Sequence, residues 1–459
     1  MKINFIKLLY EEENDMKKNK GITLVALVVT IVVLLILAGV SINLVLGNNG
    51  IIAKAKDAET KSAEASQNDL KGMNGLVSEM EGALAGNGST GSGSGNGGAG
   101  GSGADTKVPA EATAETAPYF PDNTFTKKEG TIDTGLVIQD ASGNEYVWVV
   151  VPKSLYNNTN YNSNNTKKPS SSTDYANIEY CLQQYTVTYR NGTSFFDVYY
   201  ADDKNVGWFA DATAYNNLKN SMLKSVYENG GFYVGRYEAG IDTIKGENRT
   251  SDTEKNSDGK YTIEGMPTPV TKADAYPYTW VTRTQAQNLA SNVNSGTKTS
   301  SLMFGVQWDL VLAFLSKDTT KITSTDVLTK NSTTIGNYRD SEFQLRQTGK
   351  YATMSDWTLS STWNPSTTAT TNFVDSSKNK LAQSDGNGIL VTTGTSEKNK
   401  VMNIYDVAGN VGEWTLEKAA SIRNPCACRG GDFSSAGLDF PAAGRISVSR
   451  DVSSNGFVG

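Results

Sequence analysis

The chain has 459 residues, with 42 basic and 48 acidic side chains, a net charge of −6 and no histidine. This acidic balance gives a nucleic-acid role no electrostatic support. The absence of histidine excludes Ser-His-Asp and Cys-His catalysis and His-ligated zinc. The three cysteines, Cys181, Cys426 and Cys428, are too few for a disulfide-built fold. Cys426 and Cys428 would close a very tight ring, so we expect any disulfide to include Cys181.

The N-terminal part of the chain contains a long apolar run at residues 22–46, which no charged residue interrupts. About 20 apolar residues in a helix cross a bilayer, so the run predicts one membrane-spanning helix. Lys17, Lys18 and Lys20 precede it and predict that its N-terminal side is cytoplasmic. We therefore expect a single-pass protein of the cell membrane, with everything after residue 46 outside the cell.

A glycine stands directly before the apolar run, in Lys20-Gly21-Ile22. This junction resembles the leader junction of type IV prepilins, which implies cleavage between Gly21 and Ile22 by a prepilin peptidase and methylation of the new N-terminus. The family pattern has glutamate five residues after the cut, where this chain has Ala26. The departure argues against ordinary packing into a pilus shaft but not against membrane anchoring. A plain transmembrane anchor is the alternative interpretation.

Composition divides the chain after the apolar run. Residues 1–21 are the prepilin-like leader, and residues 47–84 carry apolar side chains at helical spacing, which predicts a helical stalk. Residues 85–124 are rich first in Gly and Ser and then in Pro, Ala and Thr, so we expect a disordered linker. The folded head is predicted to occupy residues 125–459.

Within the head, hydrophobic periodicity and turn residues predict the following elements. We expect a hairpin of strands at 136–139 and 145–151, a long loop at 154–175, a helix at 211–228, a strand at 232–238 and helices at 282–292 and 305–316. Residues 317–400 are mostly Ser, Thr, Asn and Asp, and are predicted to be largely loop.

Residues 406–413 combine an acidic residue, a glycine turn and a second acidic residue. Calcium takes six to eight oxygen ligands from carboxylates, amides and backbone carbonyls. A tight turn at Gly409 can direct carbonyl oxygens inward while Asp406 and Glu413 supply charge. The alternative is a turn in which Asn410 and Glu413 satisfy backbone groups without a metal.

Residues 405–414 read YDVAGNVGEW, and Arg429-Gly430-Gly431 follows shortly after. This pair resembles the formylglycine-generating enzyme (sulfatase-modifying factor) family, and a looser likeness extends over residues 130–459. The resemblance implies an α+β, C-type-lectin-like head with much loop. It also implies a structural calcium ion, held by the side chains of Asp406 and Glu413 and the backbone oxygens of Gly409 and Val411.

The oxidase activity of that family depends on a cysteine pair after the Gly-Gly step. The corresponding positions fall at or near Ser435 and Phe440. A hydroxyl is a poorer nucleophile and soft-metal ligand than a thiolate, so we expect the head not to be an enzyme. The family's branches with histidine-bound iron are excluded by the lack of histidine. A formylglycine-generating-type oxidase is only a third hypothesis.

The C-terminal residues 430–459 mix aromatic side chains with small polar ones, which is typical of recognition surfaces. They resemble the variable region of the target proteins of diversity-generating retroelements, which implies residues that vary on the C-terminal face of a lectin-like fold. An ordinary loop is the alternative. The candidate ligand-binding residues are Ser434, Ser435, Phe440, Gly444, Ile446, Asp451, Ser453, Ser454, Asn455 and Phe457. The expected frame residues are Gly430, Gly431, Pro441, Arg445 and Gly456.

These features predict a membrane-anchored surface protein whose non-catalytic head binds an extracellular protein or glycan. The alternative is a minor pilin or pseudopilin whose head serves assembly. The resembled family continues past the position of Gly459 with Phe-Arg and a short apolar strand. We therefore expect either a further stretch of chain or a head that lacks this strand.

Overall fold

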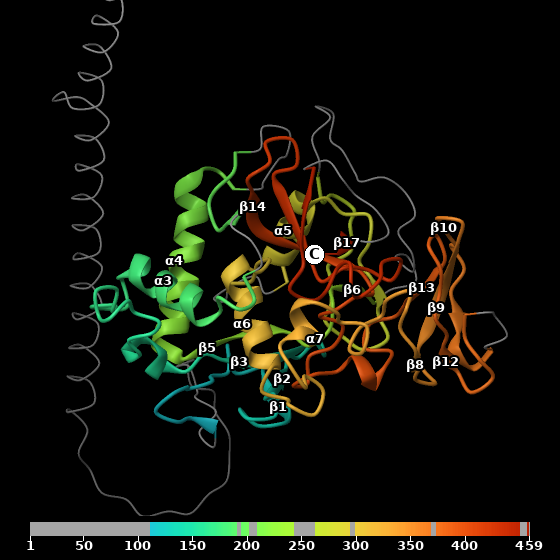
Figure 1. The fold of residues 1–459 in the computed structure, drawn as a ribbon, viewed down its shortest axis with the longest axis horizontal. Helices are drawn as coiled ribbons and strands as arrows, with labels where there is room; N and C mark the ends of the chain where they lie inside the picture. Colours follow the sequence, from blue (N-terminus) through green and yellow to red (C-terminus); the bar gives the residue numbers. More distant parts are fainter. Residues whose placement is uncertain are drawn as a thin grey trace, which may run out of the picture. The chain divides into compact units, whose positions relative to one another are not determined.

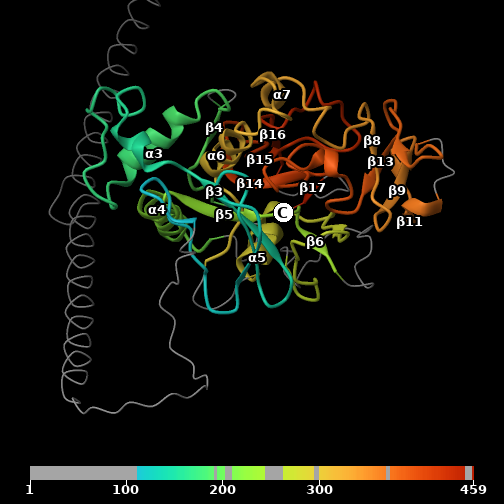
Figure 2. The same ribbon diagram turned by 90° about the horizontal axis from the view of Figure 1, so that it is seen from below.

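The computed structural model describes residues 111–190, 194–201, 209–242, 262–293, 299–368 and 373–449, and the backbone of one strand at Phe457–Val458. The predicted leader, membrane span, stalk and glycine-rich part of the linker lie outside these ranges. No helix within the described ranges is long and apolar enough to span a membrane. Helices and strands are mixed throughout the head (Figures 1 and 2).

The sequence signals that start and stop the helices agree with the structure. In α4, the Asp211 side chain accepts a hydrogen bond from the Ala214 amide at 2.8 Å, and Gly230 ends the helix at a φ of 69°. Thr282 and Gln285 form a capping box at the start of α5. The three predicted helices are confirmed to within two residues at their ends. The helices are α3 (Tyr175–Tyr185), which was not predicted, α4 (Ala212–Asn229), α5 (Arg283–Ser291), α6 (Gly305–Leu315) and α7 (Asp326–Thr329).

The first sheet is antiparallel and contains the predicted hairpin, in which Val137 pairs with Val147. The predicted strand at 232–238 is present but ends at Gly235. A short 3-10 turn, Lys153–Asn157, opens the long loop that follows the hairpin. In spatial order the strands are β1 (Thr126–Glu129), β2 (Val137–Gln139), β3 (Glu145–Val150) and β5 (Gly231–Gly235).

The second sheet carries the C-terminal motifs. Its strands are β16 (Arg445–Val448), β15 (Cys426–Arg429), β14 (Gly412–Ala419) and β17 (Phe457–Val458), with β4 (Phe195–Phe196) also pairing with β14. Helix α6 contacts both β3 and β14 and so joins the two sheets. Trp308 and Trp414 are each at most 2% exposed and belong to the core cluster that also contains Val147 and Val149 of β3.

The region predicted as loop at 317–400 contains six short strands and a small core of its own, which includes Tyr351 and Ile389. These strands gather at one end of the head, and α3 and α4 lie at the other end (Figures 1 and 2). The strands are β8 (Phe343–Gln344), β9 (Lys350–Ser355), β10 (Thr358–Leu359), β11 (Asn364–Pro365), β12 (Asn379–Lys380) and β13 (Gly388–Val391). A separate pair is formed by β6 (Gly240–Ile241) and β7 (Tyr276–Pro277).

The ordered head begins earlier than the predicted boundary at residue 125. The Thr116 hydroxyl donates to the Gly230 carbonyl at 2.7 Å and accepts from the Trp148 indole at 2.8 Å. The Tyr119 ring meets the Trp148 ring edge-on, with 5.7 Å between centroids. These contacts hold a polar segment to the first sheet, although its composition is that of a linker.

Candidate functional site

The hairpin of β14 and β15 organises the candidate site. Glu413 pairs with Arg429 in its register, and two glycines follow Arg429. Gly430 and Gly431 have φ values of 84° and 75°, which favour glycine. A Cβ on Gly430 would lie 2.5 Å from Glu413 Oε2, and one on Gly431 would lie 2.5 Å from the Phe440 carbonyl oxygen. The Gly-Gly step is therefore required both by its backbone conformation and by close neighbours.

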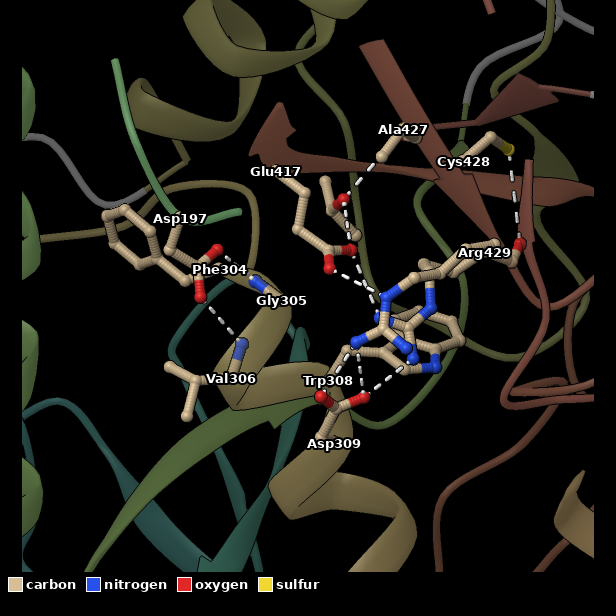
Figure 3. A network of polar contacts seen from close by, with 12 residues as sticks. Asp197, Phe304, Gly305, Val306, Trp308, Asp309, Glu417, Ala427, Cys428 and Arg429 are labelled. Carbon is tan, nitrogen blue, oxygen red and sulfur yellow. Dashed lines mark hydrogen bonds and ion pairs between the residues drawn. The ribbon is translucent and has the colours of Figure 1, made fainter. Parts of the chain in front are cut away.

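Four buried charged side chains form what we call the paired cluster: Asp309, Glu417, Arg429 and Arg445. Arg429 donates to Asp309 at 2.8 Å and to Glu417 at 3.0 Å. Arg445 donates to the same two carboxylates, at 2.7 and 2.8 Å. Figure 3 shows Arg429 between Asp309 of α6 and Glu417 of β14. Two carboxylates and two guanidinium groups thus balance in charge and tie α6, β14, β15 and β16 together.

The electrostatics of the paired cluster follow from burial and charge. At Glu417, burial opposes ionisation, but Arg429 and Arg445 outweigh it and hold the pKa at about 2. At Asp309, burial outweighs the same two arginines and raises the pKa. The Trp308 indole donates to the Ala442 carbonyl at 2.9 Å, and its ring lies 5.4 Å from the Arg429 guanidinium carbon. The cluster is therefore enclosed by core side chains.

Three other acidic side chains form the acidic cluster: Glu238, Asp406 and Glu413. Glu238 accepts from Asn410 Nδ2 at 2.6 Å and from the Val411 amide at 3.2 Å. Asp406 accepts from the Gly394 amide at 2.7 Å and from Asn399 Nδ2 at 3.2 Å. Glu413 Oε2 has no hydrogen-bond partner among the described residues. Nor does any described Lys or Arg form an ion pair with these three carboxylates.

The carboxylates of the acidic cluster disfavour one another's ionisation. Burial raises the pKa of Glu413, and the nearby charges of Glu238 and Asp406 raise it further. Burial, together with Asp406, raises the pKa of Glu238. Burial raises the pKa of Asp406 to about 6, against its two hydrogen bonds. The unbalanced charge makes this cluster the place where a proton or a cation would be most stabilising.

The predicted calcium ligands lie close together, but they do not all face one point. The space beside Gly430 is bordered by Glu413 Oε2 and the Val407 carbonyl oxygen, 2.5 and 3.1 Å from the position of a Cβ. Gly409 and Val411 lie in the turn just before Glu413, and their amides bond to the Gly430 carbonyl and to Glu238. Both oxygens of Asp406 are already hydrogen-bonded. Across the described ranges, no three His, Cys, Asp or Glu side chains are grouped to hold a metal. Of the two predicted carboxylate ligands, Glu413 therefore keeps an oxygen without a hydrogen-bond partner among the described residues, and Asp406 does not.

The turn at 408–411 also makes the contacts expected of a turn without metal. Asn410 Oδ1 accepts from the Val391 amide at 3.1 Å and from Asn337 Nδ2 at 2.8 Å. Its own Nδ2 donates to Glu238 and to the Val391 carbonyl. Asn410 is fully buried and joins β13 to the turn. Its role is thus structural, in agreement with the alternative interpretation.

Four of the ten predicted ligand-binding residues lie on the loop between β15 and β16: Ser434, Ser435, Phe440 and Gly444. Ser434 and Ser435 are half-buried, and their hydroxyls donate to the Asp432 carboxylate at 2.6 and 3.1 Å. Phe440 is 37% exposed and Leu438, not among the candidates, is 63% exposed. Gly444 and Ile446 are half-buried at the start of β16. Of the remaining candidates, Asp451, Ser453, Ser454 and Asn455 lie outside the described residues, as do Gly21 and Ile22, and only the backbone of Phe457 is described.

The three cysteines are buried, and none of them forms a disulfide bond. Cys426 and Cys428 lie in β15, before the Gly-Gly step, and Cys181 lies in α3. Burial, helped by Asp174, raises the pKa of Cys181 to about 11, and burial raises the pKa of Cys428 as well. The positions expected for the oxidase pair, Ser435 and Phe440, are both on the exposed loop.

A cavity of about 210 Å³ lies beside the acidic cluster. It is lined mainly by apolar side chains, among them Leu289 and Trp414, and Glu238 and Glu413 border it. The carboxylates of the acidic cluster are thus next to internal space, whereas those of the paired cluster are enclosed.

Sequence reasoning missed three of the acidic residues. Glu238 is the last residue of the strand predicted at 232–238, and it was not among the candidate site residues. Asp309 is the one charged residue in the apolar helix at 305–315, which was an available signal. Glu417 had no such signal, because its role depends on the register of β14 against β15. Arg445 was expected to belong to the frame around the candidate ligand-binding residues, and its side chain is buried in the paired cluster.

Comparison with family models, with curated protein sequences and with solved structures gave no match to this chain.

Proposed function

We propose that the chain is a membrane-anchored surface protein whose non-catalytic, C-type-lectin-like head binds an extracellular ligand through the loop at 432–444. The observation that carries this proposal is a loop that is exposed at Leu438 and Phe440 and whose flanking strands are joined by the buried, charge-balanced paired cluster. The apolar run at 22–46 supports anchoring of the head to the membrane.

The loop is held at both ends, which supports a role in recognition. The Tyr338 hydroxyl lies 2.6 Å from the Gly430 carbonyl oxygen and 2.9 Å from the Phe440 carbonyl oxygen. Arg429 and Arg445 fix the strands on either side of the loop. Because the loop is ordered before binding, little conformational entropy would be lost in the complex. Leu438 and Phe440 would be the apolar contacts, and Ser434 and Ser435 the adaptable polar ones.

We further propose that this loop and the residues after it are diversified. The described candidates Ser434, Ser435 and Phe440 lie on the loop outside a frame whose own side chains are buried in ion pairs, so these residues can change with little effect on the fold. Sequencing the DNA beside the gene tests this proposal. A reverse-transcriptase gene with a near-repeat of the last hundred or so bases is expected, and its absence would exclude diversification.

We also propose a structural calcium ion near Glu413. Its charge would compensate the acidic cluster, and it would link β14 to the Gly430 turn that begins the loop. Glu413 and neighbouring backbone carbonyl oxygens would be its ligands, together with water. The calcium would affect the loop only by fixing the backbone at Gly430, where the loop begins.

The function is tested with the full chain expressed in a bacterial membrane. Protease added outside intact cells should release the head, and the loop variant Leu438→Ser/Phe440→Ser should lose binding to the host or substrate surface that the wild-type cells adhere to. The exposed variant Val187→Ser serves as the control for general surface changes. Loss of pilus assembly with unchanged adhesion would instead favour the minor-pilin alternative. Oxidation of a sulfatase peptide by the full chain would favour the oxidase.

A further inference from the structure

The connection between β9 and β10 is a tight two-residue turn with an unusual second residue. Ser355 pairs with Thr358, so only Asp356 and Trp357 form the turn. Their φ values are 48° and 62°. Two-residue turns with positive φ at both positions strongly favour Asn or Asp followed by Gly. Asp356 fits this preference, and Trp357 occupies the place of the glycine.

The position of Trp357 is not explained by packing. Its side chain is 64% exposed, whereas Trp148, Trp308 and Trp414 are almost fully buried. Left-handed backbone is unfavourable for a residue with a Cβ, and burial of the ring does not offset that cost here. Strained positions that packing does not explain are typical of binding and catalytic sites.

The loop that carries Gly386 lies against both the backbone and the indole of Trp357. The Trp357 amide donates to the Gly386 carbonyl at 2.8 Å. Gly386 has a φ of 77°, and a Cβ there would lie 2.9 Å from the Trp357 Nε1 and 3.0 Å from its Cδ1. The absence of a side chain at Gly386 therefore leaves room for the pyrrole edge of the indole against this loop.

Small polar and acidic residues surround the ring. Ser384 and Asp385 are exposed in the loop that carries Gly386, and Asp356 is exposed in the turn itself. Asp385 forms an ion pair with Arg339. In the described part of residues 340–400, Trp357 is the one strongly exposed large hydrophobic side chain. A protein-binding hot spot would be expected to gather several apolar or aromatic residues. A single aromatic ring among hydroxyl and carboxylate groups suits a sugar instead.

We propose that the β9–β10 turn is a carbohydrate-binding site in which Trp357 stacks against the face of a neutral sugar ring. The C–H groups of a sugar face carry partial positive charge and are attracted to the negative face of the indole. Ser384, Asp385 and Asp356 accept hydrogen bonds from the sugar hydroxyls. This inference rests on the proposed role in ligand binding, and it adds the class of ligand and a second contact surface.

The site is linked to the C-terminal loop by direct contacts. Arg339 also lies 3.6 Å from Asp439, between Leu438 and Phe440, and its amide donates to the Ser435 carbonyl at 3.0 Å. One glycan can therefore contact Trp357 while its neighbouring units reach the loop at 432–444. The residues of the loop at 432–444 would then determine which glycan binds, and Trp357 would contact a sugar ring of each glycan.

The test uses the full chain in a detergent without a sugar headgroup. Neutral trisaccharides of β1,4-linked N-acetylglucosamine, β1,4-linked glucose and α-linked mannose are titrated by tryptophan fluorescence and calorimetry. We expect at least one to bind, and Trp357→Gly to raise its Kd at least tenfold. Because glycine suits the turn, Trp357→Gly should keep or raise the Tm. Trp357→Phe should restore part of the affinity, since it returns an aromatic face.

Two results would overturn the carbohydrate site. One is that none of the three trisaccharides binds the full chain, and the other is that Trp357→Gly binds as tightly as the wild type. The cell-adhesion assay separates this inference from the proposed function. If Trp357→Gly leaves cell adhesion intact while Leu438→Ser/Phe440→Ser removes it, the proposed function stands without the carbohydrate site.

Discussion

The paired cluster and the acidic cluster share strand β14, which carries Glu417 and Glu413, yet they differ in charge. In the paired cluster, two carboxylates meet two guanidinium groups. In the acidic cluster, three carboxylates meet amide donors only, as far as the described residues show. The first arrangement is complete and stabilises a frame. The second is incomplete without a proton or a cation, and so is the one that can respond to its surroundings.

The largest expected effect is the loss of charge balance in the paired cluster. Arg429→Met removes one guanidinium group and leaves Asp309 and Glu417 undercompensated in a buried site. Breaking a buried ion pair from one side costs about 3–5 kcal/mol. We expect chemical denaturation to show a loss of this size in the free energy of unfolding. Arg423→Met is the control, because Arg423 is exposed, and should change stability by less than about 0.5 kcal/mol. Equal stability of the two variants would show that the paired cluster is not a frame.

The acidic cluster should respond to calcium where the paired cluster does not. A ligand that binds only the folded state at 100 times its Kd stabilises it by about 2.7 kcal/mol. We expect calcium to raise the Tm of the full chain relative to the chelated protein. Glu413→Gln should abolish that rise, and Glu228→Gln, a change at an exposed position, should leave it unchanged. A calcium-induced rise that persists in Glu413→Gln would place the ion elsewhere.

A third prediction concerns Asp197, which lies beside the paired cluster (Figure 3). Its carboxylate accepts from the Gly305 and Val306 amides at the start of α6, at 2.7 and 3.0 Å. Burial, together with the charges of Glu417 and Glu179, raises its pKa to about 7, although the two amides lower it. Lys219, whose ammonium donates to the Asp197 carbonyl, is the nearest basic side chain in the described structure.

The sign of the effect follows from the raised pKa. The folded state binds this proton more tightly than the unfolded state, so the contribution to stability is complete below about pH 4 and is lost as the pH rises through 7. Asn cannot titrate but can still accept a hydrogen bond from an α6 amide. We expect Asp197→Asn to flatten the fall in stability between pH 4 and 7, as measured by denaturation at several pH values. An unchanged pH profile would show that another group controls it.

The sequence predicted the elements whose signals are local. The helix at 211–228 was predicted because Asp211 and Gly230 mark its ends, and the hairpin at 136–151 because a turn separates two apolar strands. Strand β9 was missed because most of its residues are small or polar. Strand β13, Gly-Ile-Leu-Val, was missed because it is a short apolar run in a polar stretch and its pairing partner is distant in the chain. Residues 111–124 were wrongly expected to be disordered. The hydrogen bonds that order them run to Gly230 and Trp148, which are distant in the chain and give no local signal.

The candidate site was predicted only in part, because some of its contacts join residues that are far apart in the chain. Asp406 and Glu413 stood out because they flank a glycine turn, and they do lie in one buried cluster. The local pattern could not show that Asp406 bonds to Gly394 and Asn399, or that Glu238 joins the cluster from a distant strand. Trp357 was not singled out, because neither its positive φ nor its exposure can be read from neighbouring residues.

The smallest effect on stability is expected for a substitution in the loop at 432–444. Phe440 is 37% exposed, and its backbone carbonyl oxygen lies 2.9 Å from the Tyr338 hydroxyl. Phe440→Ser keeps that carbonyl, so we expect the free energy of unfolding to change by about 0.5 kcal/mol or less. Tyr338→Phe removes the hydroxyl that joins Gly430 and Phe440 and should cost about 1 kcal/mol or more. If Phe440→Ser proves as costly as Tyr338→Phe, the loop is part of the core, and its residues cannot vary freely above a fixed frame.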